Sequence, residues 1–161
     1  MNALDVLKYG HGTVLKAVEG LPDEAWEETG VVGVWSTKDV IAHLASFEQV
    51  LAEVLGVALD PDASTPTLDL FRAGGSFNDE QVALRKGKTP AEVLAEYEGW
   101  HDRVMELAGR IGPQTFNREG TIPWYGEEYD LEDFIVYTSY GHKREHCAQI
   151  ALFKRRRASA S

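Results

Sequence analysis

The chain has 161 residues, of which 43% are apolar and 26% are charged, a balance typical of one soluble globular domain that buries its own core. Its formal net charge of −10 disfavours nucleic-acid binding, because phosphate backbones are bound by clustered Lys and Arg. A single cysteine, Cys147, excludes an internal disulfide. We expect no membrane-spanning helix and no signal peptide, and therefore a cytoplasmic protein.

Two long helices are predicted in the first third of the chain from apolar residues spaced three and four apart. The first covers about Ala3–Glu19, and the second covers about Thr37–Leu55. Ser36 is a good N-cap for the second helix, and Asp39 is placed to return a bond as in a capping box. We expect Gly56 to end this helix.

A long connection separates the second helix from the third. It spans about thirty residues, is rich in Pro and Gly, and contains one short predicted helix near Asn78–Lys86. Such a length is natural for a crossover between parallel neighbours in a helix bundle. The third long helix then opens at Thr89 as the cap with Pro90 in its first turn, and it ends at Gly112.

The last helix is predicted to start after Asp130 and to end near Arg157, following an aromatic, turn-rich segment at 121–126. Its basic residues 154–157 are more typical of a solvated helix C-terminus than of a phosphate-binding patch. Four helices without an alternating strand predict an all-α four-helix bundle. We expect a single domain over residues 1–157 and a disordered tail over 158–161.

Polar residues interrupt the inner face of the last helix. His142, His146 and Gln149 follow one another in steps of four and three on a stripe that is apolar at both ends. Buried imidazoles are costly unless something pairs with them, and two histidines one turn apart can bind one divalent metal. His43, on the inner face of the second helix, could complete a site. Hydrogen-bonded core histidines remain the alternative explanation.

Three further residues bear on this site. His11 lies on the inner face of the first helix and is a reserve ligand, although a satisfied core histidine is the more common outcome. His101 sits off the main stripe of the third helix, so we expect it to be partly exposed. Cys147 points roughly 100° away from His146 around the helix and is expected to be a packing residue.

Several segments together resemble the DinB/YfiT-like superfamily. Trp35–Leu44 is similar to its second-helix signature and His142–Ile150 to its final-helix signature, while Phe77–Gln81 and Thr89–Leu94 resemble its middle region. The resemblance implies a four-helix bundle of up-down-down-up topology, with the long crossover between its second and third helices. It also implies that the protein is often a homodimer.

The resemblance further implies a divalent metal, commonly nickel or zinc, held by His43, His142 and His146. Relatives include metal-dependent hydrolases and transferases that use a low-molecular-weight thiol, and some relatives without the full triad act as resistance proteins. Lys143 stands where many relatives have an acidic residue, which leaves the surroundings of the ligands in question.

Two classes of function are open from the sequence. A metal-dependent enzyme would act on a small-molecule substrate as a hydrolase or a thiol S-transferase, with water or a thiol activated by the metal. Asp39, Glu145 and Gln149 are candidates to orient its ligands, although Asp39 serves equally well as a capping residue. A non-catalytic protein would instead sequester a small hydrophobic compound, or hold its metal as a purely structural ion with His11 as a fourth ligand.

Overall fold

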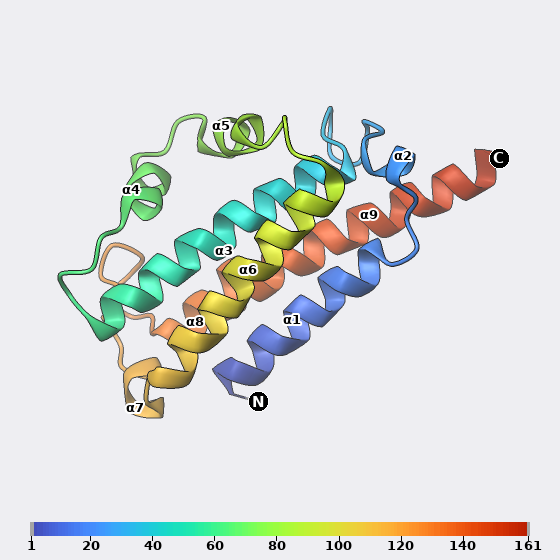
Figure 1. The fold of residues 1–161 in the computed structure, drawn as a ribbon. Helices are drawn as coiled ribbons and strands as arrows, with labels where there is room; N and C mark the ends of the chain where they lie inside the picture. The colour runs from blue at the N-terminus through green and yellow to red at the C-terminus, as the bar shows by residue number, and fades with distance from the viewer. Residues whose placement is uncertain (1, 161) are drawn as a thin grey trace.

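The structure, a computed structural model, describes residues 2–160 and is mainly helical (Figure 1). Four long helices form the bundle: α1 (Ala3–Val18), α3 (Thr37–Leu59), α6 (Pro90–Arg110) and α9 (Gly141–Ala160). Shorter segments connect them: α2 (Asp23–Trp26), α4 (Pro66–Ala73), α5 (Phe77–Leu84), α7 (Pro113–Phe116), α8 (Leu131–Phe134) and the π-helical η1 (Ile135–Tyr140). Within residues 2–160 the only strand-like pairing is an isolated bridge between Val32 and Trp35. The predicted all-α class is confirmed.

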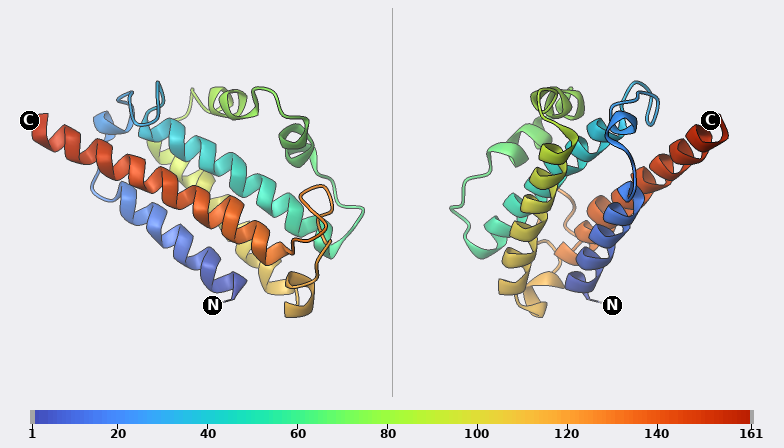
Figure 2. Two further views of the ribbon diagram at one scale, coloured as in Figure 1. Left: turned by 180° about the vertical axis from the view of Figure 1, so that it is seen from behind. Right: turned by 45° about the vertical axis from the view of Figure 1, so that its right-hand side comes forward.

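The four long helices form two pairs. α3 packs chiefly on α6, and α1 packs chiefly on α9 and η1, as the views in Figure 2 show. The chain between α3 and α6 returns along the bundle with α4 and α5 packed against α3, so that α3 and α6 run in the same direction (Figure 1). The prediction from the sequence included α5 but missed α4.

α3 is the central helix of the fold. By length and composition it could cross a membrane, with a mean hydropathy of 1.4 over its most apolar stretch, but 72% of that stretch is buried inside the fold. A helix that is apolar on most sides is expected in the core of a bundle. We therefore interpret α3 as a core helix.

The two ends of α3 compare differently with the prediction. Ser36 and Asp39 form the expected capping box at its start. The helix then continues through Gly56 to Leu59, one turn beyond the predicted end. A glycine inside a helix costs only about 1 kcal/mol relative to alanine. Ala58 and Leu59 pack against the core, and this packing favours continuing the helix.

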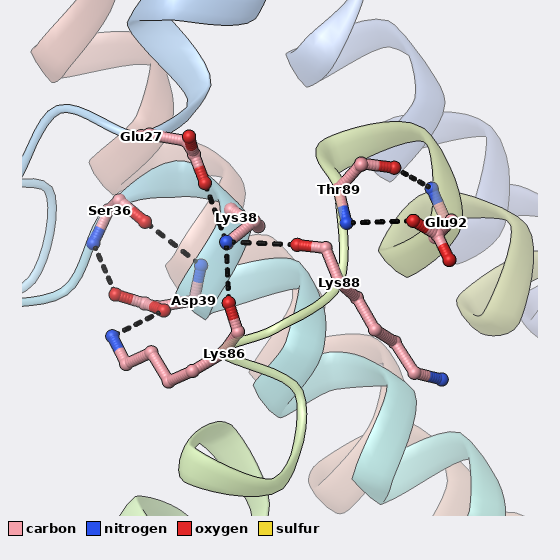
Figure 3. Close-up of polar contacts among 8 residues, drawn as sticks. All are labelled: Glu27, Ser36, Lys38, Asp39, Lys86, Lys88, Thr89 and Glu92. Carbon is pink, nitrogen blue, oxygen red and sulfur yellow. Dashed lines mark hydrogen bonds and ion pairs between the residues drawn. The ribbon is translucent and has the colours of Figure 1, made fainter.

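A buried lysine joins the starts of α3 and α6 (Figure 3). Lys38 Nζ donates to the backbone carbonyls of Lys86 at 3.2 Å and Lys88 at 3.0 Å, and it pairs with Glu27 at 2.6 Å. The predicted cap Thr89 follows immediately and begins α6. Lys38 therefore fixes the end of the crossover against the first turn of α3.

The last helix differs from the prediction in two ways. It starts after Asp130 as predicted, but it is not α-helical throughout, because the π-helical η1 lies between α8 and α9. In addition, α9 continues to Ala160, so residues 158–160, expected to be a disordered tail, are helical. Near this end Lys154 donates to the carbonyls of Ala17 and Glu19, and Arg157 pairs with Glu28. These two basic side chains therefore connect α9 to the end of α1 and the loop after it.

Candidate metal centre

Three imidazoles meet between α3 and α9. Nε2 of His43 lies 2.8 Å from Nε2 of His142, which lies 2.9 Å from Nε2 of His146. One ring nitrogen from each residue lies within 4.8 Å of the others. Two nitrogens bound to one ion at about 2.0–2.1 Å can be no more than about 4.2 Å apart. Both measured separations therefore suit a shared ion, and the structure brings together the three histidines predicted as ligands.

Aromatic side chains hold two of these rings in place. Phe47, one turn after His43 on α3, packs on both His43 and His142, with ring centroids 4.9 Å and 4.6 Å away. Trp35, just before the start of α3, also packs on His43, with ring centroids 5.0 Å apart. With these two aromatic side chains packed on its ring, His43 is only 3% exposed.

A hydrogen bond orients the third ring. Nδ1 of His146 lies 2.7 Å from Oε1 of Gln149. An amide oxygen only accepts, so Nδ1 carries the proton and Nε2 is left with its lone pair toward the other two rings. Gln149 was one of the residues predicted to orient a ligand, and the structure places it in that position.

Burial keeps the imidazoles of His43 and His142 neutral. It is the main cause that lowers the pKa of His43 to about 3 and that of His142 to about 4, and the neighbouring imidazoles add to the effect. The neutral ring is the form that binds metal, so both are ready to coordinate at pH 7 without losing a proton. Nδ1 of His43 is buried and has no hydrogen-bond partner among the described residues, so the site also contains an unsatisfied polar atom.

A small cavity of about 10 Å³ lies beside His142. It is lined mainly by apolar atoms, including those of Leu44 and Phe47, and Thr138 of η1 also borders it. This volume holds about one water molecule. η1 ends directly before the first residue of α9, and single π turns of this kind frequently occur at functional sites.

Other residues considered from the sequence lie elsewhere. Asp39 accepts from the backbone of Ser36 and pairs with Lys86 at 2.9 Å, so it caps α3 and does not orient His43. Glu145 is exposed on the surface of α9. His11 is not in the three-histidine group and instead contacts the hydroxyl of Tyr97 at 3.3 Å, which removes it as a fourth ligand in this conformation.

Two predictions about single residues have opposite outcomes. Cys147 is buried, and burial raises the pKa of its thiol to about 11, as befits a packing residue. The expectation that His101 is partly exposed is wrong, because this residue is only 4% exposed and its ring lies beside Glu48. His101 is one turn after the fully buried Tyr97, and that spacing alone could have indicated its burial.

Sequence reasoning also missed a buried ion pair next to the histidines. Nζ of Lys143 lies 2.5 Å from Oε1 of Glu48, and each of these residues is 2% exposed. The other carboxylate oxygen of Glu48 lies 3.5 Å from Nδ1 of His101. Burial alone would raise the pKa of Glu48, but Lys143 and His101 together hold it below its usual value. Glu48 falls between Leu44 and Leu51 on an apolar stripe, a signal that could have revealed it.

A match between the sequence and a protein-family pattern over most of the chain identifies the family. The sequence pattern of the DinB superfamily matches residues 7–150. The chain belongs to the DinB superfamily. The match contains all three histidines, and the predicted membership is confirmed. Neither the curated proteins nor the solved structures give a significant match to this DinB-superfamily chain.

Proposed function

We propose that this DinB-superfamily protein binds a divalent metal, zinc or nickel, through His43, His142 and His146 and acts with it on a small molecule. The observation that carries the proposal is the meeting of three imidazoles, from two helices distant in sequence, inside the bundle. A divalent cation held there would lower the pKa of a coordinated water or thiol and supply a nucleophile at neutral pH. Three protein ligands are the number typical of a reactive site, whereas structural sites usually have four.

The residues around the ligands support the same proposal. Gln149 fixes the tautomer of His146, and Phe47 limits the rotation of His43 and His142. Such support from neighbouring side chains is a regular feature of metal sites whose ligands must stay in place during a reaction. We propose two reaction classes, hydrolysis and transfer of a low-molecular-weight thiol to an electrophile.

Metal content tests the first half of the proposal. Protein purified without a histidine tag should contain up to one zinc or nickel ion per chain by elemental analysis after loading and desalting. His43→Ala should lose this metal, whereas His11→Asn, which changes another inward-facing histidine, should keep it. Metal-free wild-type protein after loading, or undiminished stoichiometry in His43→Ala, would contradict the three-ligand site.

Turnover tests the second half. The loaded protein is offered small thiols with an electrophilic acceptor and, separately, activated esters and amides, with and without a chelator. Chelator-sensitive consumption of acceptor and thiol together supports a transferase, and chelator-sensitive hydrolysis supports a hydrolase. A protein that keeps its metal but turns over neither class is not such an enzyme.

One observation favours a second candidate, a non-catalytic protein. The cavity beside His142 holds about one water molecule, which is too small for an organic substrate in this conformation. In that case the metal holds α3 to α9, or the protein binds or sequesters a small compound in a stress response. Metal that raises thermal stability without any turnover would support this candidate.

We also propose a cytoplasmic homodimer that does not bind nucleic acid or membranes. The net charge of −10 and the burial of α3 support the absence of these two partners. The dimer rests on the resemblance to the family alone. Light scattering on purified protein measures its mass directly, and a monomer at micromolar concentration would refute it.

A further inference from the structure

The candidate metal centre lies across the boundary between the two helix pairs. His43 belongs to the pair α3–α6, whereas His142 and His146 belong to the pair α1–α9 (Figure 2). The backbones of α3 and α9 come close at few points, because each helix packs mainly on its own partner, so the contact between them is made by side chains. A small slide or rotation of one pair against the other would therefore separate the ligands, so something must fix their register.

The Glu48–Lys143 ion pair crosses the same boundary beside the ligands. Glu48 follows His43 on α3 by little more than one turn, and Lys143 is adjacent in sequence to His142 on α9. The contact is 2.5 Å long, and both residues are 2% exposed. It thus joins one ligand-bearing helix to the other from inside the core.

The second oxygen of Glu48 extends the connection to the remaining two helices. It faces His101 of α6 at 3.5 Å, and the ring of His101 is stacked on His11 of α1 with centroids 3.9 Å apart. All four long helices therefore contribute one side chain to this polar layer.

General energetics indicate what such a pair is for. Removing two charges from water costs about as much as their attraction returns, so a buried ion pair adds little net stability compared with apolar residues of the same size. Its best-attested benefit is specificity of register. Apolar side chains can slide past one another with modest loss, whereas a displaced partner leaves an uncompensated charge in the core.

We propose that Glu48 and Lys143 are positioning residues, whose ion pair holds α3 and α9 in the register that brings His43 to His142 and His146. The inference rests on the proposed metal site. The pair itself supplies no ligand to the proposed metal. It acts through the backbone of the two helices, so that the ligands are already assembled when the ion arrives, and less of the binding free energy is lost in assembling them.

A double variant tests this proposal. Glu48→Gln with Lys143→Met removes both charges and keeps similar volumes, so no unpaired charge is left in the core. Its affinity for zinc is measured by competition with a chromophoric chelator, and its folding by circular dichroism. We expect a folded protein that binds zinc about 10- to 100-fold more weakly, the range found when residues supporting metal ligands are changed.

A matched control removes another ion pair. Arg85 of the segment after α5 pairs with Glu96 of α6 at 2.9 Å, and neither belongs to a ligand-bearing helix. Arg85→Met with Glu96→Gln should change thermal stability but leave the zinc affinity of the folded protein within about threefold of wild type, the scatter allowed for independent sites.

The possible results separate the two proposals. If wild-type protein binds no metal, the proposed function fails and this inference fails with it. If wild type binds zinc and the folded double variant binds equally tightly, the inference is refuted while the metal site stands. If the double variant does not fold, Glu48→Asp decides, because it keeps both charges and only shortens the reach toward Lys143. Unchanged affinity in that folded variant refutes the inference.

Discussion

Replacing Gln149 by leucine should weaken metal binding more than it destabilises the metal-free protein. In the structure Nδ1 of His146 donates to Gln149 at 2.7 Å, and His146 is 7% exposed. When metal occupies Nε2, the proton must stay on Nδ1, and in the variant that buried donor has no acceptor. An unsatisfied buried donor costs about 1–3 kcal/mol, which is a loss of roughly 5- to 150-fold in affinity.

The metal-free protein escapes part of this cost. Without an ion, the proton of His146 can move to Nε2, which lies 2.9 Å from Nε2 of His142 and can donate to it. Nδ1 then becomes an unpaired acceptor, which is tolerated better than an unpaired donor, so the free energy of unfolding of the metal-free variant should fall by less than its free energy of zinc binding. Gln149→Glu keeps an acceptor and should bind metal at least as tightly as the wild type.

The measurement is a pair of titrations on each variant: zinc competition with a chromophoric chelator, and urea unfolding in the presence of excess chelator. The reasoning is refuted if Gln149→Leu binds zinc as tightly as the wild type. It is also refuted if the loss of stability in the metal-free state equals the loss in zinc affinity, because the side chain would then act only on folding.

Four further results are expected. Zinc at one hundred times its Kd should raise the Tm by about 5–10 °C. Binding at that concentration contributes about 2.7 kcal/mol of stability, and the Tm of a domain of this size rises by about 2–4 °C per kcal/mol. A chelator should remove the shift, and His43→Ala should not show it. The metal-free protein should become less stable to urea as the pH falls from 6.5 toward 4. In the folded state the pKa is about 3 for His43 and about 4 for His11, below the ordinary 6.5, so the unfolded chain binds more protons in that range. A free energy of unfolding that is flat between pH 7 and 5 would contradict this. Lys38→Met should cost about 1–3 kcal/mol of unfolding free energy by denying two backbone carbonyls their donor, whereas Glu27→Gln, which changes its exposed partner, should cost less than about 1 kcal/mol. Cys147 should react with a disulfide reagent at pH 8 about a hundredfold more slowly than free cysteine, because burial raises its pKa to about 11; rapid labelling of the folded protein would show that the thiol is accessible.

The histidine cluster could be predicted from the sequence because each of its members sits where helical periodicity turns a side chain inward. His142 and His146 are one turn apart on the inner face of the last helix, and His43 faces the core from α3. Helix starts were predictable for a similar reason, since Ser36 and Thr89 are caps whose effect is local. Helix starts and inward-facing positions depend on nearby residues, and sequence analysis can therefore predict them.

The parts that escaped prediction depend on contacts between distant segments. Gly56 does not end α3, because packing of the following turn outweighs a small local penalty. His101 is buried because Glu48 and His11 approach it from other helices. Lys143 looks like a solvated cation on a polar stretch of sequence until its partner on α3 is known. In each case the structure is determined by a tertiary contact between residues far apart in the sequence, which a pattern of neighbouring residues does not reveal.

The π turn of η1 has a consequence for how members of this superfamily should be aligned. A π-helical turn closes a bond to the fifth residue rather than the fourth, so it accommodates one more residue than an α-helical turn. Members whose final helix is regular should therefore be one residue shorter between the positions of Leu131 and His142. An alignment without a gap there would pair the histidines of such a protein with the neighbours of His142 and His146, and it would miscount which members have the three-histidine cluster.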